Sequence, residues 1–129
     1  MPEGSIAYAN MRRALLGYVG DIPFGSVVEV STLAEALNIP ARHVAHILSR
    51  LGDDEAELLP WPRVIPRRGA FTKAQMNRPR TMRQIAHLQE EGAAFLDGAR
   101  LDMASVTCWQ PPDTHRSTFW ADLDEDQPA

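Results

Sequence analysis

The stretch "TLAEALNIPARHVAHILSRL", residues 32–51, decides the fold. Thr32 stands three residues before Glu35, a spacing that predicts a capping box and a helix over residues 33–37. "NIP" ends that helix, and Pro40 suits the first turn of a second helix, where its missing N–H costs nothing. Two short helices joined by about three residues form a helix-turn-helix arrangement.

The second helix has an apolar face and a polar face. Its apolar positions recur at i, i+3, i+4 and i+7 and are Val44, Ile47, Leu48 and Leu51. That spacing predicts a stripe directed toward a core. The opposite face carries Arg42, Ala45, His46 and Ser49. Small and basic residues on an exposed face allow a backbone or a groove wall to approach closely.

The residues before this pair predict a helix and a connection. Apolar residues on one face predict a helix over residues 8–19. Pro23 and Gly25 punctuate a turn that ends it. "SVVEV", residues 26–30, is β-branched and fits either a strand or the lead into the next helix.

The residues after the pair predict a loop and a hairpin. "GDDEAE", residues 52–57, is expected to be an acidic loop. Arg67 and Arg68 precede Gly69 between two short apolar runs, which predicts a small β-hairpin over residues 64–71 with a positive φ at Gly69. A hairpin after a helix-turn-helix is a wing.

A last helix completes the expected domain. Thr81 and Gln84 are expected to cap it, and Gly92 to end it. We therefore expect a mainly α fold, a winged helix-turn-helix-like DNA-binding domain with a small β-hairpin wing. Residues 1–112 would form this domain, and residues 113–129, with five acids and one arginine, a flexible acidic tail.

Charge is distributed unevenly along the chain. The formal net charge is -4, but residues 1–83 hold eleven Lys and Arg against eight Asp and Glu. Residues 84–129 hold two against nine. The stretch 63–83 has seven basic residues and no acid. This strip is either a phosphate-binding surface or a solvated arm balanced by the acidic end, and charge alone leaves both open.

Composition limits the compartment and the cofactors. A chain of 129 residues fits one domain. Cys108 is the one cysteine and cannot form an internal disulfide, so we expect a reducing compartment. His43 and His46 stand three apart with no third ligand, so no metal or other cofactor is expected. Because no run of about 18 apolar residues and no signal-peptide pattern occurs, we expect a cytoplasmic monomer without membrane contact.

A set of short motifs occurs in a characteristic order over roughly residues 8–112. They are "IPFG" (22–25), "LAEALNIPARHVAHIL" (33–48), "LPWPRVI" (59–65), "RRGAF" (67–71), "LQEEG" (88–92) and "WQP" (109–111). Together they resemble the DNA-binding domain of O6-alkylguanine-DNA alkyltransferases, and more closely the alkyltransferase-like proteins. The alkyltransferases have Pro-Cys-His-Arg where this chain has "PWPR", and in alkyltransferase-like proteins a tryptophan commonly replaces the cysteine. The resemblance implies that Trp61 lines a pocket for a flipped-out damaged guanine.

The chemistry of "PWPR" argues against an enzyme. Alkyl transfer needs a thiolate and a base that generates it. Trp61 supplies an aromatic face and an indole N–H, and Pro62 supplies no base. Cys108 lies outside the motif and is expected to be packed rather than reactive.

The resemblance also implies which residues meet DNA. The second helix would lie in the minor groove, with Arg42 entering the base stack in place of the extruded nucleotide. A planar guanidinium suits this role. The alternative is a surface arginine on a phosphate or an acid. The other DNA-facing residues would be Thr32, Ala41, Ala45, Ser49, Arg67, Arg68 and Lys73.

The pocket implied by the resemblance is built around Trp61. Its members would be Trp61, Leu48, Pro60, Arg63, Val64, Gly69 and Val30. Val64 would present its backbone carbonyl to the base, and Arg63 would either brace the site or touch DNA. Val30 stands where the family usually has a tyrosine.

The implied function is binding of double-stranded DNA that carries O6-alkylguanine, by nucleotide flipping and without alkyl transfer. Nucleotide excision repair proteins would be the partners, and the tail with Phe119 and Trp120 is a candidate docking segment. The alternatives are a diverged winged-helix DNA-binding protein or transcription regulator without lesion preference, a suicide alkyltransferase using Cys108, and a helical protein with no nucleic-acid role.

Overall fold

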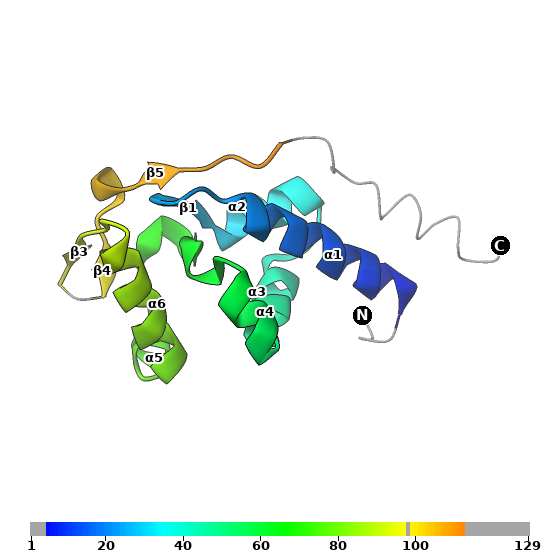
Figure 1. The fold of residues 1–129 in the computed structure, drawn as a ribbon, viewed down its shortest axis with the longest axis horizontal. Coiled ribbons are helices and arrows are strands. Elements are labelled where there is room, and N and C mark those ends of the chain that lie inside the picture. The colour runs from blue at the N-terminus through cyan, green and yellow to red at the C-terminus, as the bar shows by residue number, and fades with distance from the viewer. Residues whose placement is uncertain (1–4, 98, 113–129) are drawn as a thin grey trace.

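The computed structural model describes residues 5–97 and 99–112 (Figure 1). The helices are α1 (Ile6–Asp21), α2 (Val30–Leu37), α3 (Ala41–Ser49), α4 (Asp53–Leu58), α5 (Lys73–Met76) and α6 (Pro79–Glu90). The strands are β1 (Ser26–Glu29), β2 (Val64–Ile65), β3 (Phe95–Leu96), β4 (Arg100–Leu101) and β5 (Thr107–Cys108). Short 3-10 turns are η1 (Trp61–Arg63), η2 (Arg67–Gly69) and η3 (Met103–Ser105). The mainly helical fold with a small sheet is as expected.

The helix-turn-helix is present as α2 and α3. Asn38 adopts the left-handed conformation with φ 56°, which suits asparagine after a helix. The N–H of Ile39 then donates to the carbonyl of Ala34 at 3.0 Å and closes the end of α2. The side chains of Val44 and Ile47 are fully buried, as the spacing of the second helix predicts.

The predicted capping box at Thr32 is wrong. The helix begins at Val30, so Thr32 lies inside its first turn. Glu29 is the N-cap residue, and its side chain makes no capping hydrogen bond. Strand β1 runs directly into α2, and Glu29 is held in register with Ile65 of β2. Strand pairing therefore sets the start of α2. The stretch 26–30 was expected to be either a strand or the lead into the next helix. It is both, because residues 26–29 form β1 and Val30 begins α2.

The predicted hairpin over residues 64–71 is also wrong. Strand β2 pairs in parallel with β1, which also pairs in parallel with β5 on its other side. Because Val28 lies opposite Val64, the β2 segment is used by a distant strand and makes no antiparallel return. The antiparallel hairpin of this fold is β3–β4, and Ala70 joins its edge by a bridge to Arg100.

The predicted acidic loop 52–57 is a helix, α4. Its first turn carries Asp53, Asp54 and Glu55, whose charges favour a helix N-terminus. The Glu55 carboxylate also accepts the N–H of Gly52 at 3.0 Å. The same acids that suggest a solvated loop therefore stabilise the start of a helix.

The last helix is α6, but its predicted caps are wrong. It starts at Pro79, and both Thr81 and Gln84 lie inside it and are buried. Gly92 follows the helix with φ 99°, as predicted for its end. A proline at the first position is pre-organised for a helix and places the start two residues before Thr81.

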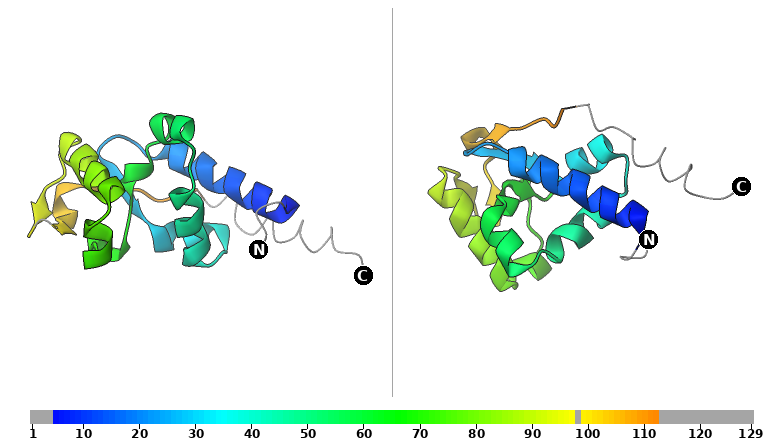
Figure 2. Two further views of the ribbon diagram at one scale, coloured as in Figure 1. Left: turned by 90° about the horizontal axis from the view of Figure 1, so that it is seen from below. Right: turned by 45° about the vertical axis from the view of Figure 1, so that its right-hand side comes forward.

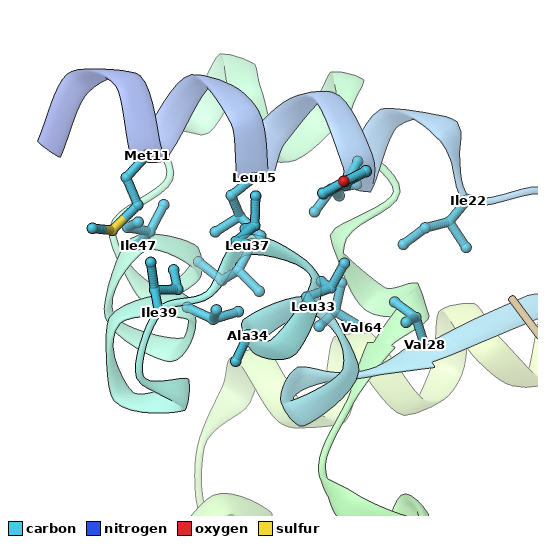
Figure 3. Close-up of a cluster of buried hydrophobic side chains, with 14 residues drawn as sticks. Met11, Leu15, Ile22, Val28, Leu33, Ala34, Leu37, Ile39, Ile47 and Val64 are labelled. Atoms are coloured by element: carbon cyan, nitrogen blue, oxygen red, sulfur yellow. The ribbon is translucent and has the colours of Figure 1, made fainter. Parts of the chain in front are cut away.

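The core consists of two clusters on opposite faces of β1. In the larger one, Met11 and Leu15 of α1 point toward Leu37 and Ile47 of the helix-turn-helix (Figure 3). Val28 belongs to this cluster, whereas its neighbour Val27 packs into the second, with Ile65, Leu88, Ala93 and Leu101. Alternate residues of a strand point to opposite faces. The short sheet therefore joins the helix-turn-helix to α6 and the hairpin.

The described residues form an elongated molecule. Helices α5 and α6 lie at the end opposite the start of α1 in all three views (Figures 1 and 2). Within the described parts of the chain, no helix has the length and apolar character needed to cross a membrane. The predicted acidic tail, including Phe119 and Trp120, lies outside the described residues.

Candidate nucleic-acid interface

A cavity of about 180 Å³ lies between α3 and α6. Its lining comes from six helices, strands and turns and consists of Val30, Ala45, Leu48, Ser49, Trp61, Val64, Pro66, Phe71, Gln75, Arg78, Arg80, Thr81 and Gln84. Four of the predicted pocket residues are among them: Val30, Leu48, Trp61 and Val64. The volume is below the roughly 300–1,000 Å³ of drug-sized ligand sites and suits one planar group.

Trp61 is held on the cavity wall by a rigid segment. It is the first residue of η1, between Pro60 at the N-cap and a buried Pro62. The buried Gln84 amide donates to the carbonyls of Pro62 at 3.1 Å and Val64 at 2.7 Å. These bonds fasten the segment to α6. They also occupy one acceptor position of the Val64 carbonyl that was expected to face a base.

Arg80 stacks on Trp61 inside the cavity. Its guanidinium carbon lies 4.6 Å from the centroid of the Trp61 ring, within the range of a cation–π contact. The same guanidinium donates to the carbonyl of Leu48 on α3. Burial, and then the nearby Arg83 guanidinium, lower the pKa of Arg80. Arg80 thus connects α6, the Trp61 wall and the end of α3.

Arg63 lies outside the cavity lining and binds the protein itself. Its guanidinium donates to both carboxylate oxygens of Glu91 at 2.8–3.1 Å and to the carbonyl of Ile22 at 2.7 Å. The two charged side chains are 14% and 6% exposed. A buried, bidentate pair of this kind is a structural clamp. The geometry favours the bracing alternative for Arg63 over direct DNA contact.

Two further predicted pocket residues support the wall from outside. Pro60 is half-buried and precedes Trp61 in the chain. Gly69 is buried with φ 70°, and a Cβ there would lie 2.7 Å from the Cβ of Leu101. Gly69 is therefore a packing contact with β4.

The predicted DNA-facing residues fall into three groups. Ala45 and Ser49 line the cavity. Arg42, Ala41 and the half-buried Thr32 lie on the helix-turn-helix, with Arg42 exposed at the second position of α3. The third group is exposed, lies outside the cavity lining and consists of Arg67, Arg68 and Lys73. Arg42 thus projects from the same helix that borders the cavity.

The family model for the DNA-binding domain of 6-O-methylguanine DNA methyltransferase matches residues 10–93, well over half of the chain. The chain belongs to this family. The matched residues include the helix-turn-helix and the whole cavity lining, and they end before β3, β4 and β5. No curated protein matches the chain.

Solved structures of alkyltransferase-like proteins are similar over most of the chain. One is an S. pombe ATL in complex with DNA, with TM-score 0.65 and 25% identity over 80% of this chain and 97% of that one. The other is S. pombe Atl1 in complex with damaged DNA containing O6-carboxymethylguanine, with TM-score 0.64, 26% identity and the same coverage. The resemblance to alkyltransferase-like proteins is confirmed.

The sequence did not predict part of the wall of the cavity between α3 and α6. The missed residues are Pro66, Phe71, Gln75, Arg78, Arg80, Thr81 and Gln84. Arg78 and Arg80 belong to the basic strip, which was a signal for them. Gln84 resembles a helix cap in the sequence, and only its buried position against the Pro62 and Val64 carbonyls reveals its role.

The chain's cysteine lies away from this cavity. Cys108 is exposed in β5, so the expectation that it is packed is wrong. A two-residue edge strand leaves its side chain open to solvent. Among the described residues, no group of three His, Cys, Asp or Glu is placed to hold a metal ion.

Proposed function

We propose that this protein binds duplex DNA containing O6-alkylguanine and receives the flipped base in the cavity between α3 and α6. The observation that carries the proposal is the position of Trp61 on the wall of a cavity that α3 itself borders. A base extruded beside α3 would reach an aromatic face without crossing the protein. Family membership and the DNA-bound relatives support DNA as the ligand.

The energetics of flipping are compatible with this geometry. Extrusion costs a few kcal/mol, and less for a badly paired damaged base. Stacking on an aromatic side chain returns about 1–3 kcal/mol per base. Arg42, exposed near the start of α3, would fill the vacated place in the stack. The relative bound to O6-carboxymethylguanine supports an alkylated guanine as the preferred base.

The protein would bind the lesion without removing the alkyl group. Trp61 has no nucleophilic atom and Pro62 no base, and the cavity lining contains no cysteine among the described residues. Transfer of a labelled methyl group from DNA to Cys108 would contradict this part of the proposal. Bound protein would instead mark the lesion for nucleotide excision repair in the cytoplasm. A monomer would suffice, because one chain supplies both the helix and the cavity.

The test compares two labelled duplexes that differ by one O6-methylguanine. Binding is titrated at fixed salt, since phosphate contacts make affinity steeply salt-dependent. Wild type, Arg42→Ala and Arg13→Ala are compared, because Arg13 is equally exposed but lies on α1. We expect tighter binding to the lesion, a loss of about tenfold or more with Arg42→Ala, and little change with Arg13→Ala.

Equal binding of wild type to both duplexes would overturn the proposal. A transcription regulator with this fold would instead prefer a base sequence and ignore the O6 substituent. A change of similar size in both arginine variants would show that Arg42 contributes only charge.

A further inference from the structure

The cavity between α3 and α6 contains positive charge that the described protein does not neutralise. Its lining includes two arginines, Arg78 and Arg80, and no acidic residue among the described part of the chain. Arg78 is exposed, whereas Arg80 is half-buried against Trp61. The charge that faces a bound base is therefore mainly the Arg80 guanidinium.

Arg80 has unused hydrogen-bonding capacity. A guanidinium carries five N–H donors, and among the described residues Arg80 uses its Nη2 to donate to the carbonyl of Leu48. Within residues 5–97 and 99–112, the ion pairs found involve other cations. Arg83 on the same helix carries a like charge that acts on Arg80. A half-buried cation in this state attracts an anion or a strong acceptor.

The other polar groups of the cavity do not compete for that role. The Gln84 amide nitrogen is committed to the carbonyls of Pro62 and Val64. Gln75, whose side-chain oxygen accepts the N–H of Thr72 at 2.7 Å, carries no charge, and neither do Ser49 and Thr81. The remaining wall is largely apolar. A base that stacks on Trp61 shares that wall with Arg80, so the substituent on the base and the guanidinium occupy one small space.

We propose that Arg80 is a specificity-determining residue that selects the O6 substituent by its charge. An adduct ending in a carboxylate is bound in preference to a neutral alkyl group of the same shape, through charge-assisted hydrogen bonds from the guanidinium. This inference rests on the proposed function, because it concerns the base held in the same cavity.

A phosphate contact is the other use of an arginine at this position. Arg83 serves as the matched residue, since it lies three positions further along α6, is exposed and does not line the cavity. Loss of a phosphate contact weakens binding to every duplex by the same factor and reduces the salt dependence. Loss of a residue that selects the substituent by its charge instead changes the ratio of the affinities for the charged and neutral adducts.

The experiment titrates four duplexes that differ at one base: guanine, O6-methylguanine, O6-carboxymethylguanine and the near-isosteric, neutral O6-isobutylguanine. Wild type is compared with Arg80→Gln, Arg80→Lys and Arg83→Gln at fixed salt. We expect wild type to bind the carboxymethyl adduct about tenfold more tightly than the isobutyl adduct, a ratio typical of one charge-assisted contact. Arg80→Gln should abolish this ratio, so that the carboxymethyl and isobutyl adducts bind with equal affinity.

The two control variants make the result specific. Arg83→Gln should keep the wild-type ratio, and Arg80→Lys should keep part of it because the charge remains without the planar fork. Thermal unfolding of each variant checks that the fold is retained, and Arg80→Lys carries the test where Arg80→Gln fails to fold.

The outcomes separate this inference from the proposed function. Binding of all four duplexes with one affinity would overturn both. A preference for O6-methylguanine over guanine, with equal affinity for the carboxymethyl and isobutyl adducts, would overturn the role of Arg80 and leave lesion binding intact. A uniform loss for all duplexes with Arg80→Gln would assign Arg80 to a phosphate and also overturn it.

Discussion

The position of the cavity wall depends both on residues that line the cavity and on residues that lie outside it. Trp61 faces the cavity, and its position depends on the bonds between Gln84 and the two carbonyls that follow it. Gly69, outside the cavity lining, packs so closely that an added Cβ would lie 2.7 Å from the Leu101 Cβ and 3.2 Å from the Met103 Sδ. A residue that never touches a ligand is therefore a sensitive position for stability.

Replacing Gly69 by alanine is expected to destabilise the protein. The new Cβ would lie 2.7 Å from the Leu101 Cβ, and φ is 70°. Gly25→Ala is the matched control, because φ is 79° there but no atom lies within 4 Å. Strain alone costs about 1 kcal/mol, and overpacking at Gly69 adds about 1–3 kcal/mol. Urea unfolding of both variants measures the difference. Equal losses of stability would show that β4 moves to accommodate the new Cβ at no cost in free energy.

At the level of elements, Glu91 joins three segments at the end of α6. Its carboxylate accepts hydrogen bonds from Arg63 of η1 and from the N–H of Gly25 before β1 at 3.1 Å. It also lies 2.6 Å from Nε2 of His87 and accepts from that nitrogen when the nitrogen is protonated. Burial alone would raise the pKa of Glu91, but the bonds from Arg63, Gly25 and His87 outweigh it and hold the pKa below its ordinary value.

This pKa shift predicts how stability depends on pH. A carboxylate with a lowered pKa contributes stability above its ordinary value of 4.5, and that contribution is lost as pH falls through the lower folded pKa. Glu91→Gln should lose about 3 kcal/mol at pH 7, since it leaves Arg63 buried without its counter-charge. It should also show a shallower loss of stability below about pH 4.5 than wild type.

Glu90→Gln is the control for this effect, because Glu90 is exposed on the same helix. Denaturant unfolding between pH 7 and pH 3 distinguishes the variants. Parallel pH profiles for wild type and Glu91→Gln would show that other acids cause the acid sensitivity.

At the scale of the whole molecule, the fold extends to residue 112. The Tyr18 hydroxyl of α1 donates to the carbonyl of Pro112 at 2.8 Å. Trp109 lies edge-on to the same Tyr18 ring at 6.3 Å. The segment after β5 therefore packs on α1 and joins the described end of the chain to the larger core cluster.

A chain ending at Pro112 is expected to bind lesion-containing DNA with wild-type affinity and to lose capture of nucleotide excision repair proteins. The physical reason is that the cavity and α3 lie entirely before residue 112, whereas Phe119, Trp120 and all five tail acids lie after it. Titration of the duplexes and pull-down with repair proteins measure the two properties. The full-length double variant Phe119→Ala, Trp120→Ala should behave like the shortened chain, and unchanged capture would remove the tail from the proposal.

The helix pair α2–α3 and the position of Trp61 follow from the sequence by itself. Apolar spacing and the residues Asn38 to Pro40 determine the helix pair, because these signals act between near neighbours in the chain. The motif order identifies the family.

Only the tertiary structure decided the sheet and the far wall of the cavity. Val64 and Ile65 join β1 in parallel, although their local sequence favours a hairpin. Arg80 meets Trp61 only because α6 packs beside η1. Thr32 and Thr81 have the local pattern of caps, but a strand and a proline set the helix starts. Pairing and burial between distant segments outweigh local preferences of about 1 kcal/mol, and a linear pattern does not contain those contacts.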